Sequence, residues 1–261
     1  MEEVRRPAVA GSFYPADPER LRAQVRGFLR DAPGSGEAPK ALIVPHAGYV
    51  YSGPIAASGY ARLGRGRGLV TRVVLLGPSH RVPFRGMALS GARAFATPLG
   101  DVPVDLAAVE AVRDLPHVKV WDAPHEHEHS LEVQLPFLQE VLGSFLLVPV
   151  VVGDAAASEV DALLERLWGG PETAVVVSSD LSHYLDQVSA TQVDRATTAS
   201  ILALRPEAIG TEAACGFFPV RGLLVAARNH GLRAEALDLR TSGDTAGDRD
   251  RVVGYGAYAF A

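Results

Sequence analysis

The chain has 261 residues, 48% of them hydrophobic, which is enough to bury the core of a single domain covering residues 1–261. The formal net charge of −5, with no long basic block, makes nucleic acid an unexpected partner. The single cysteine, Cys215, cannot form an internal disulfide. No apolar run is long enough to cross a membrane, and the first residues lack the apolar core of a secretion signal, so we expect a cytoplasmic protein.

Helical and strand-like segments alternate along the chain. Asp17 is a predicted cap for a helix that starts at Pro18, and further helical patterns cover 54–63, 131–142, 160–167, 188–204 and 220–229. Apolar runs typical of buried strands occupy 41–44, 72–76, 145–152, 174–177, 234–239 and 252–260. This order predicts an α/β fold, a three-layer αβα sandwich around a mixed, mainly parallel sheet, with the last run as an antiparallel strand.

Polar side chains follow three of the predicted strands. His46, His80 and the pair Asp180 and His183 each lie just beyond a strand's C-terminal end. In open α/β sheets, ligands bind in the crevice outside these ends. A single histidine at such a place can simply bond to the backbone, but three converging segments favour a site. Imidazole and carboxylate groups together are suitable ligands for Fe(II) or zinc.

A histidine-rich run, PHEHEHS, covers residues 124–130. His129 lies near the start of the helix expected at 131–142 and is therefore a candidate functional residue. We expect His125 and His127 to belong to a solvated surface run. Pro136 removes one helical hydrogen bond, so it should kink this helix.

Two further features allow both a functional and a structural interpretation. Asp180 and His183 are three residues apart, a spacing that on a helical turn lets an aspartate orient an imidazole for proton transfer. Asp180 or Ser182 can equally cap the next element. Cys215 has apolar neighbours in the sequence, so we expect a small buried structural residue rather than a nucleophile.

Several motifs together resemble the Memo family over nearly the whole chain, namely PHAGY at 45–49, LGPSH at 76–80, EHSLE at 128–132, SSDLSHY at 178–184 and SGD at 242–244. The resemblance implies a fold similar to class III extradiol dioxygenases, which use non-haem Fe(II) to open catechol-like rings. For prokaryotic members it also implies association with a radical S-adenosylmethionine protein and a small partner domain.

The resemblance also implies roles for individual residues. His46 and His80 match the family's metal-binding histidines, and His183, with Asp180 beside it, matches the catalytic histidine of the dioxygenases. Animal members carry a cysteine ligand in the late loop, where this chain has Asp244, followed by Thr245. A metal set of His46, His80 and Asp244 would favour Fe(II), with zinc and copper as the other expected cofactors.

The sequence is compatible with three alternative functions. The first is a metal-dependent oxidoreductase or dioxygenase acting on a phenolic or other small substrate, with His183, Asp180 and His129 as the catalytic candidates. The second is a non-catalytic protein that binds a metal or a peptide in the same crevice, with Tyr49, Tyr51 and Tyr184 as its lining. The third is a zinc hydrolase that uses the same ligands and a bound water.

Overall fold

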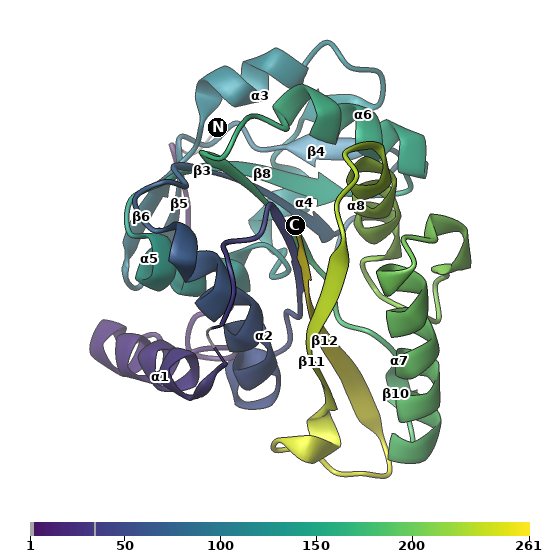
Figure 1. The fold of residues 1–261 in the computed structure, drawn as a ribbon. Helices are drawn as coiled ribbons and strands as arrows, with labels where there is room; N and C mark the ends of the chain where they lie inside the picture. Colours follow the sequence, from purple (N-terminus) through teal and green to yellow (C-terminus); the bar gives the residue numbers. More distant parts are fainter. Residues whose placement is uncertain (1–2, 34) are drawn as a thin grey trace.

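The structure is a computed structural model and describes residues 3–33 and 35–261. In this part of the chain a nine-stranded sheet has the order β10-β12-β2-β9-β3-β8-β4-β7, with β11 also paired to β12 (Figure 1). The central strands are parallel and comprise β2 (Ala41–Val44), β9 (Thr173–Ser178), β3 (Arg72–Pro78) and β8 (Leu146–Val152). The flanking strands are β4 (Met87–Leu89), β7 (Val118–Val120), β10 (His183–Leu185), β11 (Ala234–Thr241) and β12 (Val252–Phe260).

The sheet is mixed because antiparallel pairs lie outside its parallel centre. Strand β12 pairs antiparallel with β2, β10 and β11, and β4 pairs antiparallel with β8. All residues of β2 and β9 are buried, as expected for apolar strands covered on both faces. The mixed, mainly parallel sheet and the antiparallel last strand are therefore confirmed.

Helices cover both faces of the sheet (Figure 1). One layer contains α1 (Pro18–Asp31), α2 (Tyr49–Leu63) and α5 (Leu135–Leu142). The other contains α3 (Leu106–Val112), α6 (Ala157–Leu167), α7 (Gln187–Leu202) and α8 (Phe217–Asn229). A short helix, α4 (Ala123–Glu126), and a small sheet of β1 (Val4–Arg5), β5 (Ala94–Thr97) and β6 (Gly100–Pro103) complete the fold. The three-layer αβα sandwich is thus confirmed.

The two largest differences from the expected helix boundaries are at the starts of α2 and α5. Helix α2 starts at Tyr49, because the carbonyl of Gly48 already accepts hydrogen bonds from the amides of Tyr51 and Ser52. Helix α5 starts at Leu135 after a 3-10 turn, so Pro136 lies in its first turn. A proline there lacks only an amide that has no helical partner, and the predicted kink is wrong.

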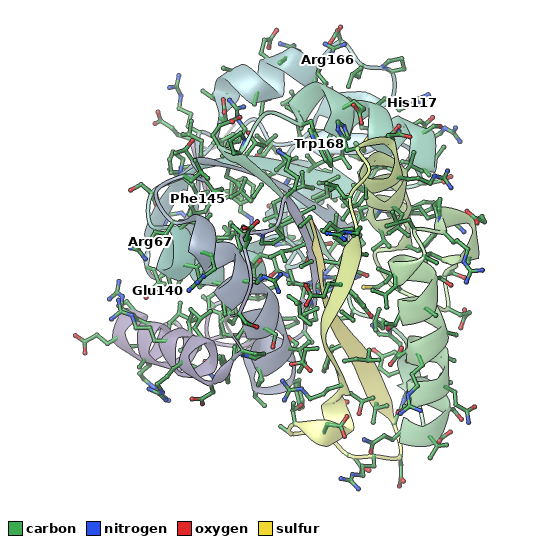
Figure 2. All side chains as sticks on the ribbon, in the orientation of Figure 1. Arg67, His117, Glu140, Phe145, Arg166 and Trp168 are labelled. Carbon is green, nitrogen blue, oxygen red and sulfur yellow. The ribbon has the colours of Figure 1, made fainter. Side chains whose placement is uncertain are left out.

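Most buried apolar side chains of the sheet and of both helical layers belong to one hydrophobic cluster. Charged side chains lie at the outer surface, among them Arg166 of α6, which is labelled in Figure 2. Among the described residues, no helix combines the length and the hydropathy that crossing a bilayer requires.

Candidate metal centre

The C-terminal ends of three neighbouring parallel strands meet at one edge of the sheet. In the strand register, Val44 of β2 lies beside Ser178 of β9, and Leu76 of β3 lies beside Val177. The chain continues from these ends into His46, His80 and Asp180. The structure therefore brings together the residues that the sequence places after three separate strands.

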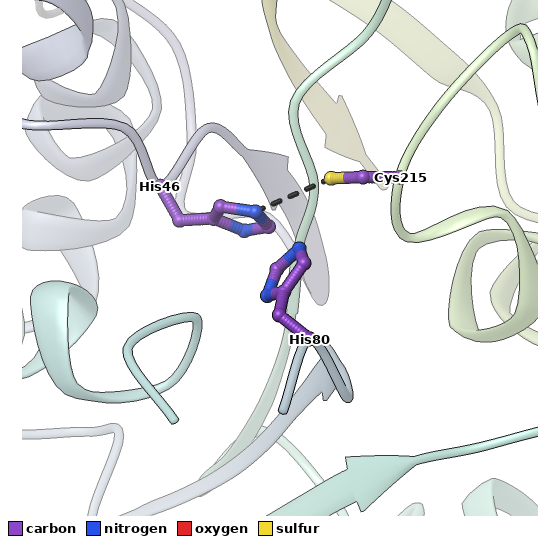
Figure 3. Close-up of side chains that lie close together, drawn as sticks. All are labelled: His46, His80 and Cys215. Carbon is purple, nitrogen blue, oxygen red and sulfur yellow. Dashed lines mark hydrogen bonds between the residues drawn. The ribbon is translucent and has the colours of Figure 1, made fainter. Parts of the chain in front are cut away.

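His46, His80 and Cys215 form the three-donor group, in which one potential ligand atom from each residue lies within 4.8 Å of the others. The Sγ atom of Cys215 is 3.2 Å from Nε2 of His46, the contact marked in Figure 3. The His46 and His80 rings are 5.1 Å apart between centroids. Two imidazoles and one sulfur are thus available to a single ion.

Cys215 reaches this group from the loop before α8. Its amide donates to the carbonyl of Asp180 at 3.2 Å, and the amide of Gly216 donates to Ser179 Oγ at 2.9 Å. A Cβ at Gly216 would lie 2.7 Å from the Cβ of Ser179, so this close approach requires glycine. The expected small buried residue thus has its thiol directed at His46, a direction that the apolar sequence neighbours do not set.

Burial, reinforced by the nearby Asp180 carboxylate, raises the pKa of the Cys215 thiol well above its ordinary value. In the metal-free chain, the sulfur therefore retains its proton. An ion bound by this sulfur would have to displace the proton, as metals do at thiol ligands.

Hydrogen bonds present the Nε2 lone pair of His46 to the same space. Ser178 Oγ donates its one proton to the carbonyl of Ser130 at 2.6 Å and accepts a bond from Gln134 Nε2 at 2.8 Å. It must then accept from Nδ1 of His46, which is 2.8 Å away. With the proton on Nδ1, Nε2 is free to bind a metal. Burial, together with the nearby histidines, holds the pKa of His46 well below its ordinary value, so the ring is neutral.

Glu128 orients the His80 ring much as Ser178 orients the His46 ring. Glu128 was not among the functional residues predicted from the sequence. Its carboxylate accepts bonds from Nδ1 of His80 at 2.9 Å and from the His80 amide at 2.6 Å. Burial alone would raise the pKa of Glu128, but these bonds and those from backbone amides lower it to about 2. A carboxylate that orients a metal-binding histidine is a common supporting arrangement. The available signal in the sequence was the EHSLE motif at 128–132, which follows α4.

His129 and His183 lie beside the three-donor group and face the same pocket. The His129 ring stacks on His80 with centroids 4.8 Å apart, and burial lowers the pKa of His129 to about 4. Nδ1 of His183 is 2.8 Å from the carbonyl of Leu181, to which it donates, so its Nε2 is free. Both predicted catalytic histidines are therefore within the site.

Asp180 does not orient His183 by a hydrogen bond. Its Oδ1 atom accepts from the backbone amide of His46 at 2.7 Å. Burial raises the pKa of Asp180 despite this bond. Its carboxylate therefore positions the His46 segment, which differs from the role inferred from the three-residue spacing.

The late loop, residues 242–251, does not supply Asp244 to the three-donor group. The Asp244 carboxylate accepts bonds from the amide and hydroxyl of Thr241, at 2.8 and 3.0 Å, and from Gln187 Nε2 at 2.6 Å. These bonds close a turn, and Asp244 belongs to no cluster of potential ligands among the described residues. The structure thus does not bring the predicted third ligand, Asp244, into the three-donor group. Asp248, by contrast, lines the pocket.

The strand-end pocket is the cavity of about 590 Å³ that opens at these residues. Four imidazoles, from His46, His80, His129 and His183, line it together with Asp180, Phe13, Tyr51, Tyr184, Tyr255 and Arg251. The guanidinium of Arg251 lies 4.6 Å from the centroid of the Tyr184 ring. The pocket therefore offers proton-carrying groups at its base and aromatic surfaces at its walls.

Glu132 anchors the N-terminal arm at the edge of this pocket. Its buried carboxylate pairs with Arg5 and accepts bonds from the amide of Val9 at 3.0 Å and from the Tyr14 hydroxyl at 2.6 Å. This anchor places Phe13 against His129, with 4.8 Å between ring centroids. The arm thus forms one wall of the strand-end pocket.

The remaining histidines lie outside the site. His127 is 75% exposed, as expected for a surface run. His125 is buried, and its Nε2 is 3.0 Å from the carbonyl of Ala88, so the expected exposure is wrong for this residue. His117 pairs with Glu159 at 2.9 Å near α6 (Figure 2).

Comparisons with known proteins show the family and the fold of the chain. Relatives named MEMO1 family protein include one from Methanopyrus kandleri, 38% identical over 98% of both chains, and one from Ignicoccus hospitalis, 36% identical over 98% of both. The fold resembles that of an uncharacterised Escherichia coli K12 protein, JW3007, with a TM-score of 0.53 and 13% identity, covering 84% of this chain and 98% of that one. A sequence profile described as Memo-like protein matches residues 5–259, and the chain therefore belongs to the Memo family.

Proposed function

We propose that this protein is a metal-dependent oxidoreductase that acts on a phenolic or other small substrate in the strand-end pocket. The observation that supports this proposal is the convergence of His46, His80 and Cys215 within 4.8 Å of one another. Hydrogen bonds from both histidine Nδ1 atoms leave the Nε2 lone pairs free for an ion. This arrangement of donors supports the binding of one ion by His46, His80 and Cys215.

The sulfur donor changes which metals are favoured. A two-histidine, one-carboxylate set would suit the Fe(II) of ring-cleaving oxygenases, whereas two histidines and a cysteine are also typical of copper redox sites and suit zinc. We therefore propose a redox-active ion, copper or iron, held by the three-donor group. Such an ion, when bound, would supply one-electron chemistry next to the strand-end pocket.

The chain's own residues can bind the substrate and carry its proton. His129 and His183 line the pocket, and an imidazole nitrogen of each can accept a proton from a hydroxyl group brought within hydrogen-bond distance. Tyr51 and Tyr255 supply ring surfaces against which an aromatic substrate would pack. These features favour a small phenolic molecule over an aliphatic one.

Metal analysis of anaerobically purified protein tests the proposal. We expect about one equivalent of copper or iron in the unmodified protein, and its loss in His46→Ala, His80→Ala and Cys215→Ala. The matched control, His127→Ala, removes an exposed histidine and should retain the metal. Electron paramagnetic resonance during a redox titration should show one-electron cycling of the ion.

Other results would favour the competing functions. Stoichiometric zinc with no redox signal would support the hydrolase, in which the ion activates a water. Absence of any metal after anaerobic purification and reconstitution would contradict the oxidoreductase and favour peptide binding in the same pocket.

A further inference from the structure

A second cavity reaches Cys215 and shares no lining residue with the strand-end pocket. This Cys215 cavity has a volume of about 290 Å³ and lies between the end of β3, the segment after β8 and the start of α8. Its lining includes Ser79, the residue before His80, as well as Cys215 itself. Residues of the three-donor group therefore line two separate cavities.

The walls of the Cys215 cavity are mainly apolar. The apolar lining residues are Phe84, Val152, Phe217, Phe218, Pro78, Val82 and Pro83. Ser79 adds little polarity, because its hydroxyl already donates to the carbonyl of Val82 at 2.6 Å. The lining also includes Asp154, but this residue is exposed, so the lining of the Cys215 cavity contains no buried carboxylate.

The strand-end pocket has the opposite character. Its lining carries four imidazoles, the carboxylates of Asp180 and Asp248 and the guanidinium of Arg251. Charged or strongly polar molecules find partners there, whereas in the Cys215 cavity they would lose their hydration without compensation. At about 290 Å³, the Cys215 cavity is also close to the ~300 Å³ lower limit of pockets that hold drug-sized ligands.

We propose that the Cys215 cavity admits a small, uncharged, apolar molecule of the size of dioxygen to the three-donor group, while the polar substrate enters through the strand-end pocket. The use of such a molecule as a co-substrate rests on the proposed function. The cavity's preference for apolar molecules does not, because it follows from the lining alone. Apolar cavities lined by aliphatic and aromatic side chains can bind xenon.

Xenon is accordingly the first probe. Crystals of the unmodified, metal-free full chain under xenon pressure should show a xenon atom between Phe84, Val152 and Phe218. Val82→Trp places an indole at the cavity wall and should remove that atom. Val50→Trp makes the same substitution at an exposed position of the strand-end pocket and should leave xenon in place. Absence of xenon from the unmodified chain would overturn the proposal.

Thiol modification tests whether the path reaches the sulfur. Cys215 is the single cysteine of the chain, so mass spectrometry of the metal-free protein reports its reaction without ambiguity. We expect Val82→Trp to slow modification by neutral methyl methanethiosulfonate about tenfold and Val50→Trp to have little effect on it. In the protein without substitutions, the anionic sulfonatoethyl methanethiosulfonate should react with Cys215 far more slowly than the neutral reagent.

The opposite pattern would contradict the inference. If Val50→Trp slows the neutral reagent and Val82→Trp does not, the sulfur is reached through the strand-end pocket. Both assays use metal-free protein, so a failure of metal binding would leave their results unchanged. The two proposals can therefore fail independently.

Discussion

Two loops reach the C-terminal edge of the sheet, and they use their polar residues differently. The loop before α8 directs the thiol of Cys215 at His46, with 3.2 Å between Sγ and Nε2. The late loop also lines the strand-end pocket, but the carboxylate of Asp244 accepts its hydrogen bonds from Thr241 and Gln187. One loop offers a donor to an ion, and the other closes its own turn.

The difference shows that a ligand must be free of stronger local partners. A carboxylate beside a backbone amide and a hydroxyl is readily satisfied within its own turn. The thiol of Cys215 has only weak partners, since sulfur is a poor hydrogen-bond acceptor, and it remains available. A carboxylate therefore needs more than proximity in the sequence to join a metal site.

The largest expected effect is the loss of metal affinity in Cys215→Ala. Removal of one of three donors should weaken binding by at least about a hundredfold, a larger change than loss of a residue that only supports a ligand. Asp244→Ala should leave the affinity almost unchanged, because its carboxylate lies in a separate hydrogen-bonded turn. Anaerobic competition with a chromophoric chelator measures both affinities. Retention of metal by Cys215→Ala, with loss in Asp244→Ala, would reverse the assignment.

A smaller effect is expected at Glu128, which supports His80 without belonging to the three-donor group. Glu128→Gln keeps the shape of the side chain but removes the charge that holds Nδ1 of His80 in place. We expect metal affinity about 10- to 100-fold lower, as for other supporting carboxylates. Glu126→Gln changes an exposed glutamate of the same segment and serves as the control. Equal affinities in the two variants would exclude the orienting role.

The sequence was sufficient to predict the layers and the convergence of His46 and His80. Buried parallel strands have continuous apolar runs, and their C-terminal ends must share an edge, so residues that follow them meet there. The predicted strand at 41–44 agrees with β2. Both results follow from local patterns that do not depend on distant contacts.

The third donor could not be predicted from the sequence in this way. The position of Cys215 depends on the packing of α8 and on the contact of Gly216 with Ser179, which brings together residues far apart in the chain. The sequence shows the apolar neighbours of the cysteine but not the direction of its side chain. His125 illustrates the same limit, since it alternates with exposed residues and is nevertheless buried.

Gly216 offers a second substitution, besides Cys215→Ala, in the loop before α8. In Gly216→Ala the new Cβ would lie 2.7 Å from the Cβ of Ser179, so the loop must shift away from the strand end. We expect a loss of about 1–3 kcal/mol in the free energy of unfolding, as for other overpacked sites, together with weaker metal binding. Gly210→Ala is the control, because nothing lies within 4 Å of its added Cβ. Chemical denaturation of both variants gives the comparison, and equal stabilities would show that the close approach is unimportant.

The smallest expected effect concerns Asp244 and depends on pH. Partial burial alone would raise its pKa, but bonds from Thr241 and Gln187 hold the pKa below its ordinary value of 3.8. A carboxyl group whose pKa is lower in the folded than in the unfolded chain stabilises the fold at pH values above its pKa in the unfolded chain. This stabilisation is lost as the pH falls through its pKa in the folded chain. Asp244→Asn should therefore cost about 1 kcal/mol or less at neutral pH.

This cost should shrink as the pH falls below 3.8 and disappear once the pH lies below the lowered pKa of Asp244 in the folded chain, where the carboxyl is as neutral as asparagine. Denaturant titrations of metal-free protein at a series of pH values measure the difference. If Asp244 were instead a metal ligand, Asp244→Asn would change the stability mainly in the presence of metal, because ligand binding stabilises only the folded chain that holds it. A difference that depends on pH and not on metal thus identifies Asp244 as the residue that closes the turn, and leaves Cys215 as the third donor.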